Sequence, residues 1–228
     1  SLVAPHDVRW GIVARVIDGD TFVLRSGEKV RLLGIDAPEL AHGTTPEEPL
    51  ARKARARLRR LVEGRRVRLA FDAVRTDGYG RLLAQVYLAD GRWVNGILVR
   101  EGLALVYTFE PNHRWVGKLL ALERAARRER RGIWRTRRFA VRRAERVHSR
   151  DVGRFVLVRG RISDARRWFW RMGRLAVSVP RKARAWFGRP PLVHTGDEVL
   201  VRGVLRASPG GKLYIAIHSP WDLEVIGR

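Results

Sequence analysis

The sequence predicts an α+β chain made of two β-rich units joined by a basic segment. Within residues 1–135, short β-favouring runs separated by turn residues are interspersed with three stretches of helical spacing, whereas the helical signal fades after Gly153. A hydrophobic content of 45% is sufficient for a buried core. We therefore expect domains at 1–135 and 153–228, with a basic connector at 136–152.

The first domain has five strand-like runs and three helical ones. We expect strands at RWGIVARVI, TFVLRS, KVRLLGI, VRLAFD and RLLAQVYLAD, parted by turns such as DGD, SGE and TDGYG. We expect helices over PLARKARARLRRLVEG, which stops at Gly64, over VNGILVREG, and from about Trp115 to Arg131. Antiparallel strands with helices of this kind indicate a five-stranded OB-type barrel packed against about three helices.

The second domain reads as almost entirely β. FVLVRGRISDARR, RLAVSVP, EVLVRGVLRA, KLYIAIHSP and DLEVI are five strand-like runs, and SPGGK between two of them is a hairpin turn. Five short strands over this length favour a second, mostly β, OB-like barrel. A fragment of a β-sandwich is the alternative.

The charge of the chain favours a polyanionic partner. Lys and Arg number 47 against 23 Asp and Glu, which gives a net charge of +24. Nucleic acid is the first class of partner that such an excess indicates, and an anionic membrane surface is the second. No apolar run approaches the roughly 18 residues of a membrane span. An arginine-rich coding bias is the alternative explanation of the charge.

The absence of cysteine narrows the chemistry that is available. The chain has no cysteine, so disulfides, thiolate metal sites and a cysteine nucleophile are excluded. This composition is compatible with a protein of the cytosol and with an exported one.

Two acidic segments follow neighbouring strands. VIDGDTFVL contains Asp18 and Asp20 around a glycine, and RLLGIDAPE contains Asp36 and Glu39. Loops at the ends of adjacent antiparallel strands can lie side by side, and clustered carboxylates need a cation or protons to neutralise them. Oxygen ligands without His or Cys indicate a hard ion, Ca²⁺ or Mg²⁺. Ordinary turn chemistry explains each segment alone equally well.

Two arginines complete a set of groups suited to phosphodiester hydrolysis. Arg31 lies five residues before Asp36, and Arg81 follows the tight turn in TDGYGR. A metal polarises the phosphoryl oxygen, a carboxylate takes a proton from water, and guanidinium forks stabilise the developing charge. In a chain so rich in arginine, a solvated surface role for either residue is the alternative.

Five motifs follow one another along the chain: VIDGDT, VRLLGIDAPE, TDGYGRLLAQVYL, VNGILVREGLALVY and RRGIW. In content and order they resemble the staphylococcal nuclease (thermonuclease) family over residues 10–135. The resemblance implies calcium bound by Asp20, Asp36 and the backbone carbonyl of Ala37, with Asp18 as a supporting acid near the metal. It also implies that Glu39 acts as general base or orients the attacking water.

The same resemblance gives roles to two arginines and two tyrosines. Arg31 and Arg81 match the family's phosphate-binding arginines, and Tyr79 and Tyr107 match tyrosines of the nucleotide pocket. Packing against the barrel is the alternative for each tyrosine. Three departures bear on specificity: Ala37 stands where the best-known member has Thr, Gly78 replaces a basic residue, and HGTTPEEP replaces a Lys-rich loop.

From about Gly153 the chain is similar to an OB-like extension of some bacterial relatives, on GRFVLVRGRI, VRGVL and IHSPWDLEVI. Its aromatic residues lie among arginines, which suggests a single-strand platform that includes Trp168, Trp170 and Trp186. A hydrophobic face that docks on the first domain explains the same residues equally well.

Taken together, these features predict a metal-dependent nuclease that acts on single- or double-stranded DNA, RNA or both. The family resemblance implies that the metal is calcium and that cleavage leaves 3′-phosphate ends. The alternative is a non-catalytic nucleic-acid-binding or interaction protein on the same barrel. A cationic membrane-surface protein fits less well, because the most basic helix has an apolar stripe that faces a core. We expect a monomer without a membrane span, and an extracytoplasmic location, periplasmic or secreted, where calcium is plentiful.

Overall fold

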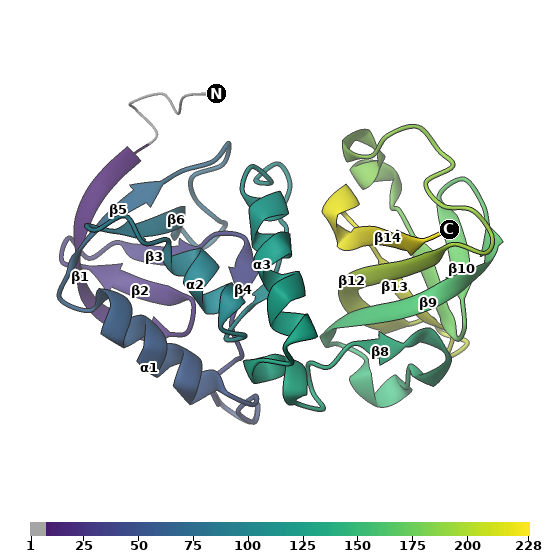
Figure 1. Cartoon of the computed structure of the whole chain (residues 1–228), viewed down its shortest axis with the longest axis horizontal. Helices are drawn as coiled ribbons and strands as arrows, with labels where there is room; N and C mark the ends of the chain where they lie inside the picture. Colours follow the sequence, from purple (N-terminus) through teal and green to yellow (C-terminus); the bar gives the residue numbers. More distant parts are fainter. Residues whose placement is uncertain (1–7) are drawn as a thin grey trace. The chain divides into compact units, whose positions relative to one another are not determined.

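The structure is a computed structural model that describes residues 8–228, and the chain divides into two compact units, Ser1–Arg138 and Phe139–Arg228 (Figure 1). Residues 1–7 of the expected first domain lie outside the described range. Each unit has its own hydrophobic core. In the described range, no helix has both the length and the apolar character that a membrane span requires.

In the first unit, five strands close into a barrel in the order β1-β2-β3-β6-β5. β3 and β6 run parallel, and the other neighbours pair antiparallel. Three α-helices and a small β4–β7 sheet accompany the barrel within residues 8–138, which confirms the predicted α+β class. The bounds are β1 Val8–Asp18, β2 Thr21–Leu24, β3 Lys29–Leu32, β4 Ile35–Asp36, α1 Ala51–Val62, β5 Arg66–Ala70, β6 Leu82–Leu88, α2 Val94–Arg100, β7 Leu105–Val106 and α3 Val116–Arg128.

The α1 helix shows how the sequence pattern produces this packing. Its buried side chains recur every three or four residues, and most of the residues between them are arginines that reach solvent. The buried set is Ala51, Ala54, Leu58, Leu61 and Val62. The chain reverses just beyond the helix at Gly64, whose φ of 75° is a conformation that favours glycine. α1 thereby packs an apolar stripe against the barrel beside β1 and β2 (Figure 1).

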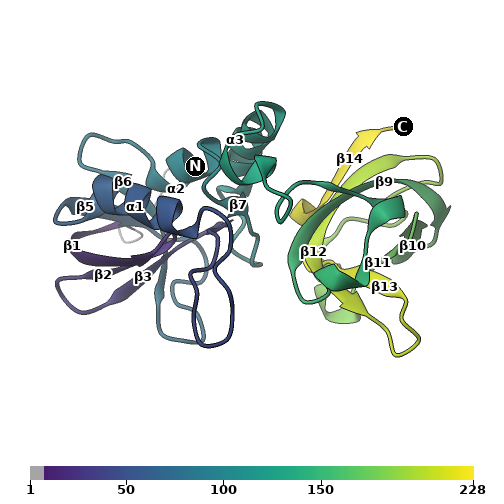
Figure 2. The ribbon, with the colours of Figure 1, turned by 90° about the horizontal axis from the view of Figure 1, so that it is seen from below.

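The second unit is also a five-stranded barrel, in the order β9-β10-β11-β13-β12 and closed by pairing of β12 with β9 (Figure 2). β11 and β13 are its parallel pair. β8 extends the sheet beside β9, and β14 extends it beside β12. The bounds are β8 Arg142–Arg143, β9 Phe155–Ala165, β10 Phe169–Met172, β11 Leu175–Ser178, β12 Glu198–Ala207, β13 Leu213–Ala216 and β14 Leu223–Gly227.

The second barrel differs from the sequence-based expectation in two details. The expected strand DLEVI is β14, which lies outside the closed ring, and the ring contains β10 instead. β10 has only four residues and stands in an aromatic stretch, which hid its alternation. In addition, residues 139–152 of the segment expected as a connector belong to the second unit, where Ala144 and Val147 enter the core.

Candidate active site of the first barrel

The turn between β1 and β2 carries two of the predicted site residues. Asp18 pairs with Thr21 across the turn, and its Oδ1 accepts a hydrogen bond from the backbone N–H of Asp20 at 3.0 Å. A Cβ atom on Gly19 would lie 2.7 Å from the Cβ atoms of both Ala37 and Ala54. Glycine is therefore required here by close approach, because the turn is pressed between the segment after β4 and helix α1.

The carboxylate of Asp20 is buried and held on both oxygens. Its Oδ1 accepts a hydrogen bond from the Thr21 hydroxyl at 3.0 Å, and its Oδ2 accepts one from the backbone N–H of Ala37 at 2.8 Å. Asp20 is only 5% exposed. These bonds fix the orientation of the carboxylate and tie the DGD turn to the DAPE segment.

Arg31 lies between the two acidic segments. Its Nη1 donates to the carbonyl oxygens of Leu32 and Ile35 at 2.6 and 2.8 Å. Its Nη2 lies 3.5 Å from Oδ2 of Asp20 and 3.4 Å from Oδ1 of Asp36. The structure thus brings Arg31, Asp20 and Asp36 together around one guanidinium.

The acids of this cluster raise one another's pKa. Burial, followed by the charge of Asp20, raises the pKa of Asp18 to about 7 and that of Asp36 to about 7. Burial and the charges of Asp20 and Glu48 also raise the pKa of Glu39. Burial acts to lower the pKa of Arg31, but the neighbouring carboxylates raise it overall. One guanidinium is therefore too little positive charge for the acids around it.

The oxygen atoms at this site fit a hard divalent cation. The carboxylates of Asp20 and Asp36 share one guanidinium nitrogen of Arg31. Ala37 is only 5% exposed, yet its carbonyl oxygen accepts no hydrogen bond from residues 8–228. Such an all-oxygen set is the kind that Ca²⁺ or Mg²⁺ prefers. In the described part of the chain, no three His, Cys, Asp or Glu side chains form a metal-binding group. Backbone and water oxygens would therefore complete the coordination.

Glu39 is exposed and stands on a braced loop. Its backbone N–H donates to Oε1 of Glu48 at 3.0 Å, and its carbonyl oxygen accepts the N–H of Glu48 at 2.9 Å. Glu48 also forms an ion pair with Arg138 at 2.7 Å. Glu48 was not predicted from the sequence, although the acidic pair in HGTTPEEP was its signal.

Arg81 is held by Asp77, a second residue that the sequence analysis missed. Oδ2 of Asp77 accepts a hydrogen bond from Nε of Arg81 at 2.7 Å, and its Oδ1 accepts the backbone N–H groups of Tyr79 and Arg81 at 2.9 and 3.0 Å. The two terminal nitrogens of Arg81 form no hydrogen bond with the described residues. Arg81 directly precedes Leu82, which pairs with Val30, the neighbour of Arg31 on β3. Although Arg81 is thus close to Arg31 in the sheet, it forms an ion pair with Asp77 and not with the acidic cluster.

Both predicted tyrosines reach solvent, so burial in the barrel does not explain them. Tyr79 is 88% exposed, and its ring centroid lies 5.5 Å from the guanidinium carbon of Arg81. Tyr107 is 39% exposed, and its N–H donates to the carbonyl oxygen of Gly34 at 3.0 Å. Because Leu105 pairs with Asp36, Tyr107 follows the strand that borders the acidic loop.

The expected aromatic platform of the second barrel is wrong in one member. Trp170 has no exposed surface and belongs to the core, so no base can stack on it. Trp168 is half-buried against that core, with Phe187 edge-on at 6.5 Å and Arg184 over its ring at 5.2 Å. Trp186 is 45% exposed. The three tryptophans therefore do not share one surface role.

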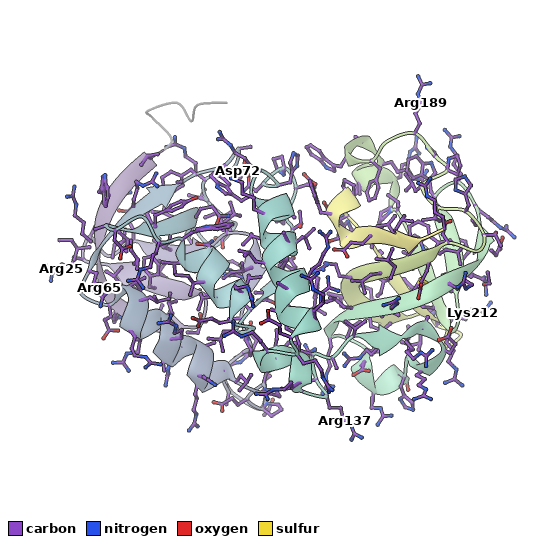
Figure 3. All side chains as sticks on the ribbon, in the orientation of Figure 1. Arg25, Arg65, Asp72, Arg137, Arg189 and Lys212 are labelled. Atoms are coloured by element: carbon purple, nitrogen blue, oxygen red, sulfur yellow. The ribbon has the colours of Figure 1, made fainter. Side chains whose placement is uncertain are left out.

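Basic side chains are spread over both units. Arg25, Arg65, Arg137 and Arg189 extend away from the ribbon (Figure 3). Residues 1–135 have 26 basic and 16 acidic residues, and residues 136–228 have 21 and 7. The excess of positive charge is therefore denser in the second half.

Comparison with known proteins agrees with the geometry of the first barrel. A family model described as staphylococcal nuclease homologue matches residues 29–136. The thermonuclease of Staphylococcus intermedius is 36% identical over 126 residues, which cover 54% of this chain and 74% of that protein. The thermonuclease of Staphylococcus hyicus is 34% identical over 54% of this chain and 73% of its own length. Endonuclease YncB of Bacillus subtilis (strain 168) is 40% identical over 53% of this chain and 59% of its own length. The chain belongs to the staphylococcal nuclease family of thermonuclease-like hydrolases.

Proposed function

We propose that this chain is a calcium-dependent phosphodiesterase that hydrolyses DNA, RNA or both and leaves 3′-phosphate ends. The observation that carries the proposal is the cluster in which Asp20 and Asp36 share the Nη2 atom of Arg31. A cluster of acids with raised pKa values, beside an exposed glutamate, needs a cation to neutralise it, and a bound cation would in turn attract an anionic phosphate. The family membership supports the same reaction class.

Asp20, Asp36 and the carbonyl oxygen of Ala37 are the groups that would hold calcium. When bound, the ion would neutralise these carboxylates and polarise a phosphoryl oxygen. Asp18 would not contact the ion itself but would help to position Asp20, because its Oδ1 accepts a hydrogen bond from the backbone N–H of Asp20. Asp20 in turn fixes the peptide of Ala37. Replacement of threonine by alanine at this position leaves the backbone oxygen available.

Glu39 is suited to take a proton from the attacking water. Its side chain is exposed, and its raised pKa makes it a stronger base than an ordinary glutamate. The water oxygen forms a bond to phosphorus, its proton goes to Glu39, and the bond from phosphorus to the 5′ oxygen breaks. The 5′ oxygen takes a proton from solvent, and the phosphate stays on the 3′ side.

The two arginines would stabilise charge on the reacting phosphate. Asp77 orients Arg81 through Nε and leaves both terminal nitrogens for two phosphate oxygens. Arg31 presents Nη2 at the acidic cluster. Tyr79 and Tyr107, both exposed, would contact the nucleotide on either side.

We also propose that the protein works outside the cytosol. The support is chemical: a calcium-dependent nuclease needs plentiful calcium and separation from the host genome. Cell fractionation of the source organism tests this, because the protein should be recovered from periplasm or medium. Recovery from the cytosol alone would contradict it.

The experiment for the proposed function uses the purified 228-residue chain with single-stranded DNA, duplex DNA and RNA, in Ca²⁺ or EGTA. We expect cleavage in Ca²⁺ and none in EGTA, with 3′-phosphate ends on the products. Glu39→Gln and Arg81→Ala should each lose at least about 100-fold in rate. Glu198→Gln and Arg159→Ala, which alter an exposed ion pair of the second barrel, are the matched controls.

Two outcomes would overturn the proposed function. Calcium-independent cleavage, or full activity in both the Glu39 and Arg81 variants, contradicts the mechanism. Absence of cleavage together with salt-sensitive binding identifies the alternative, a non-catalytic nucleic-acid-binding protein.

A further inference from the structure

The strand pairing of the two barrels is equivalent, and it identifies the face of the second barrel that occupies the same position in the fold as the proposed catalytic face of the first. Val30 pairs with Leu82 in the parallel strands of the first barrel, and Leu175 pairs with Leu213 in those of the second. All four side chains face their barrel's core. The next residue on the third barrel strand points outward and is Arg31 in the first barrel and Ala176 in the second. The outer face of β10, β11 and β13 therefore corresponds to the face that holds the acidic cluster.

This face of the second barrel has a floor of small residues with an aromatic ring on either side. Its outward residues form two cross-strand rows, Arg171–Ala176–Tyr214 and Phe169–Ser178–Ala216. The residues that alternate with them, such as Trp170 and Ile215, are buried. Phe169 and Tyr214 are partly exposed and stand two strands apart, roughly 10 Å across the sheet. Two rings over a low floor leave room for flat groups to stack.

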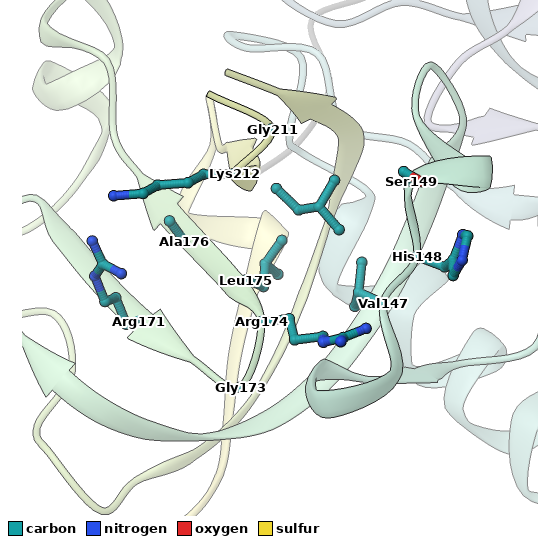
Figure 4. A pocket seen from close by; sticks show the side chains of 11 residues that line it. Val147, His148, Ser149, Arg171, Gly173, Arg174, Leu175, Ala176, Gly211 and Lys212 are labelled. Carbon is teal, nitrogen blue, oxygen red and sulfur yellow. The ribbon is translucent and has the colours of Figure 1, made fainter. Parts of the chain in front are cut away.

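A cationic cavity opens at one end of the same face. It has a volume of about 450 Å³, and Arg171, Arg174, Lys212 and His148 are among its lining residues. Figure 4 shows Arg171 and Lys212 on one side of it and His148 on the other. No Asp or Glu lines it, and in the described part of the chain its three Lys and Arg side chains form no ion pair. The guanidinium of Arg171 also lies 5.7 Å from the ring centroid of Phe169.

We propose that this surface, which we call the barrel-2 face and define by Phe169, Arg171, Arg174, Ala176, Lys212 and Tyr214, binds single-stranded nucleic acid. Backbone phosphates would occupy the cationic cavity, and bases would stack on the two rings. A duplex keeps its bases stacked on each other, so only a single strand can use both features. The inference rests on the proposed function in one respect, the choice of nucleic acid as the partner.

The barrel-2 face replaces the platform expected from the tryptophans. Phe169 on β10 and Tyr214 on β13 point outward on either side of β11, whereas Trp170 is in the core and Trp168 is packed against it. Trp186 is exposed but lies on the 3₁₀ helix Arg181–Trp186, outside the three strands of the face. Trp186 therefore separates the two hypotheses.

The test measures binding of a fluorescent 20-nucleotide single strand to the full chain in EGTA, by anisotropy over a series of salt concentrations. Phe169→Ala/Tyr214→Ala removes the rings, and Arg171→Ala/Lys212→Ala removes two cations of the cavity. The controls are Trp186→Ala and Arg143→Ala/Lys182→Ala, which remove a ring and two exposed cations elsewhere in the same unit. Thermal melting and near-ultraviolet circular dichroism confirm that each variant is folded.

We expect the ring variant to bind about 10- to 100-fold more weakly, because each stacked base contributes substantially to affinity. The cation variant should lower the slope of log K against log salt by about 1.4, since each lost contact with a single strand removes about 0.7. Both controls should stay within about 2-fold of the wild type. A duplex of the same length should be insensitive to the ring variant.

The inference is overturned if both test variants bind like their controls, or if Trp186→Ala is the variant that loses affinity. Equal binding of duplex and single strand with no effect of the rings also overturns it, because the surface is then electrostatic only. Cleavage of a dinucleotide in Ca²⁺ is measured in parallel and should be the same in all these variants. If the wild type does not cleave but the binding pattern holds, the proposed function fails and this inference stands.

Discussion

The two barrels of this chain share one strand order and one parallel pair, but they carry opposite charges on the corresponding face. In both, a cation directly precedes the last barrel strand, Arg81 before β6 and Lys212 before β13. The first barrel adds an acidic cluster around Arg31, whereas the second has Ala176 at the matching position and rings beside it. The same fold thus supplies an exposed face in both barrels, and a few side chains decide whether that face is suited to cleave nucleic acid or only to bind it.

The two units also differ in how their buried acids affect stability. The pKa values of Asp18 and Asp36 are raised to about 7, so ionising them works against the folded state of the first unit. Asp151 of the second unit shows the opposite balance: burial acts to raise its pKa, but bonds to Arg142 and Arg154 lower it overall. The first unit thus holds acids in a strained electrostatic arrangement, as functional sites commonly do.

The largest effect is expected from the charge at the centre of the acidic cluster. Arg31→Gln should reduce cleavage by about 1,000-fold or more, because it removes the proposed phosphate ligand and leaves Asp20 and Asp36 without their shared cation. Initial rates on single-stranded DNA in Ca²⁺ measure this. Arg159→Gln, an exposed arginine of the second barrel, is the control and should be unchanged. Equal losses in both variants would remove the distinction between the barrels.

A second prediction concerns the tight turn that places Asp20. Gly19→Ala adds a Cβ atom 2.7 Å from Ala37 and Ala54, so it should destabilise the first unit by about 1–3 kcal/mol and slow cleavage. Urea unfolding and calcium titration measure both effects. Gly188→Ala is the control, since a Cβ atom there meets nothing within 4 Å. Wild-type stability in Gly19→Ala would show that the turn has room to move.

A third prediction concerns pH. The folded-state pKa of Asp18 and of Asp36, about 7, exceeds the ordinary value of 3.8, so the folded state binds more protons between these values. Stability of the calcium-free first unit should therefore increase by roughly 1–3 kcal/mol as pH falls from 8 to 5. Saturating Ca²⁺ should reverse the trend, because it favours the ionised acids. Hydrogen exchange resolved by peptide separates the two units.

The second unit should not share this gain. The pKa of Asp151 is lowered, so its contribution to stability is present above its ordinary pKa of 3.8 and is lost below it. Exchange in the second unit, after correction for the intrinsic rate, should show no gain in protection from pH 8 to 5. Burial lowers the pKa of His218, so this unit loses rather than gains stability as pH falls below the ordinary histidine value of 6.5, and it loses more in stronger acid. A gain in the second unit equal to that of the first would contradict the assignment of the effect to Asp18 and Asp36.

The smallest effect is expected from the buried tryptophan of β10. Trp170→Phe should change the affinity for single-stranded DNA by less than about 2-fold, because the side chain has no exposed surface. Its indole N–H has no hydrogen-bond partner among the described residues, so loss of that group costs little, and the smaller phenyl ring should lower stability by about 1–3 kcal/mol through the cavity it leaves. Anisotropy and thermal melting measure these changes. A large loss of affinity at unchanged stability would return Trp170 to the nucleic-acid surface.

Much of the fold could be predicted from local patterns. The three helices showed apolar residues at helical spacing, and the strands of the first barrel lay between clear turn signals. β10 was missed because its first outward-facing residue, Phe169, is as apolar as its core-facing residues Trp170 and Met172. Only Arg171 shows the alternation of polar and apolar residues that marks a strand. A four-residue strand of this kind depends on its neighbours β9 and β11 for its conformation.

The candidate site could be predicted in its members but only partly in its geometry. Motif order identified Asp20, Asp36 and Arg31, and the structure brings them together. Glu48 and Asp77 were missed, because their roles depend on loops that fold back onto Glu39 and Arg81. The spacing of residues in a sequence does not predict which loops fold back to contact a distant residue.

The most direct test of the account is calcium-dependent cleavage by the full chain and by Asp20→Asn. Asn keeps an oxygen for the N–H of Ala37 but removes the charge that would hold calcium. We predict that the wild type cleaves single-stranded DNA in Ca²⁺ and not in EGTA, and that Asp20→Asn remains folded but loses at least about 100-fold in rate. Cleavage by Asp20→Asn at the wild-type rate, or wild-type cleavage in EGTA, would contradict the claim that the first barrel is a calcium-dependent active site.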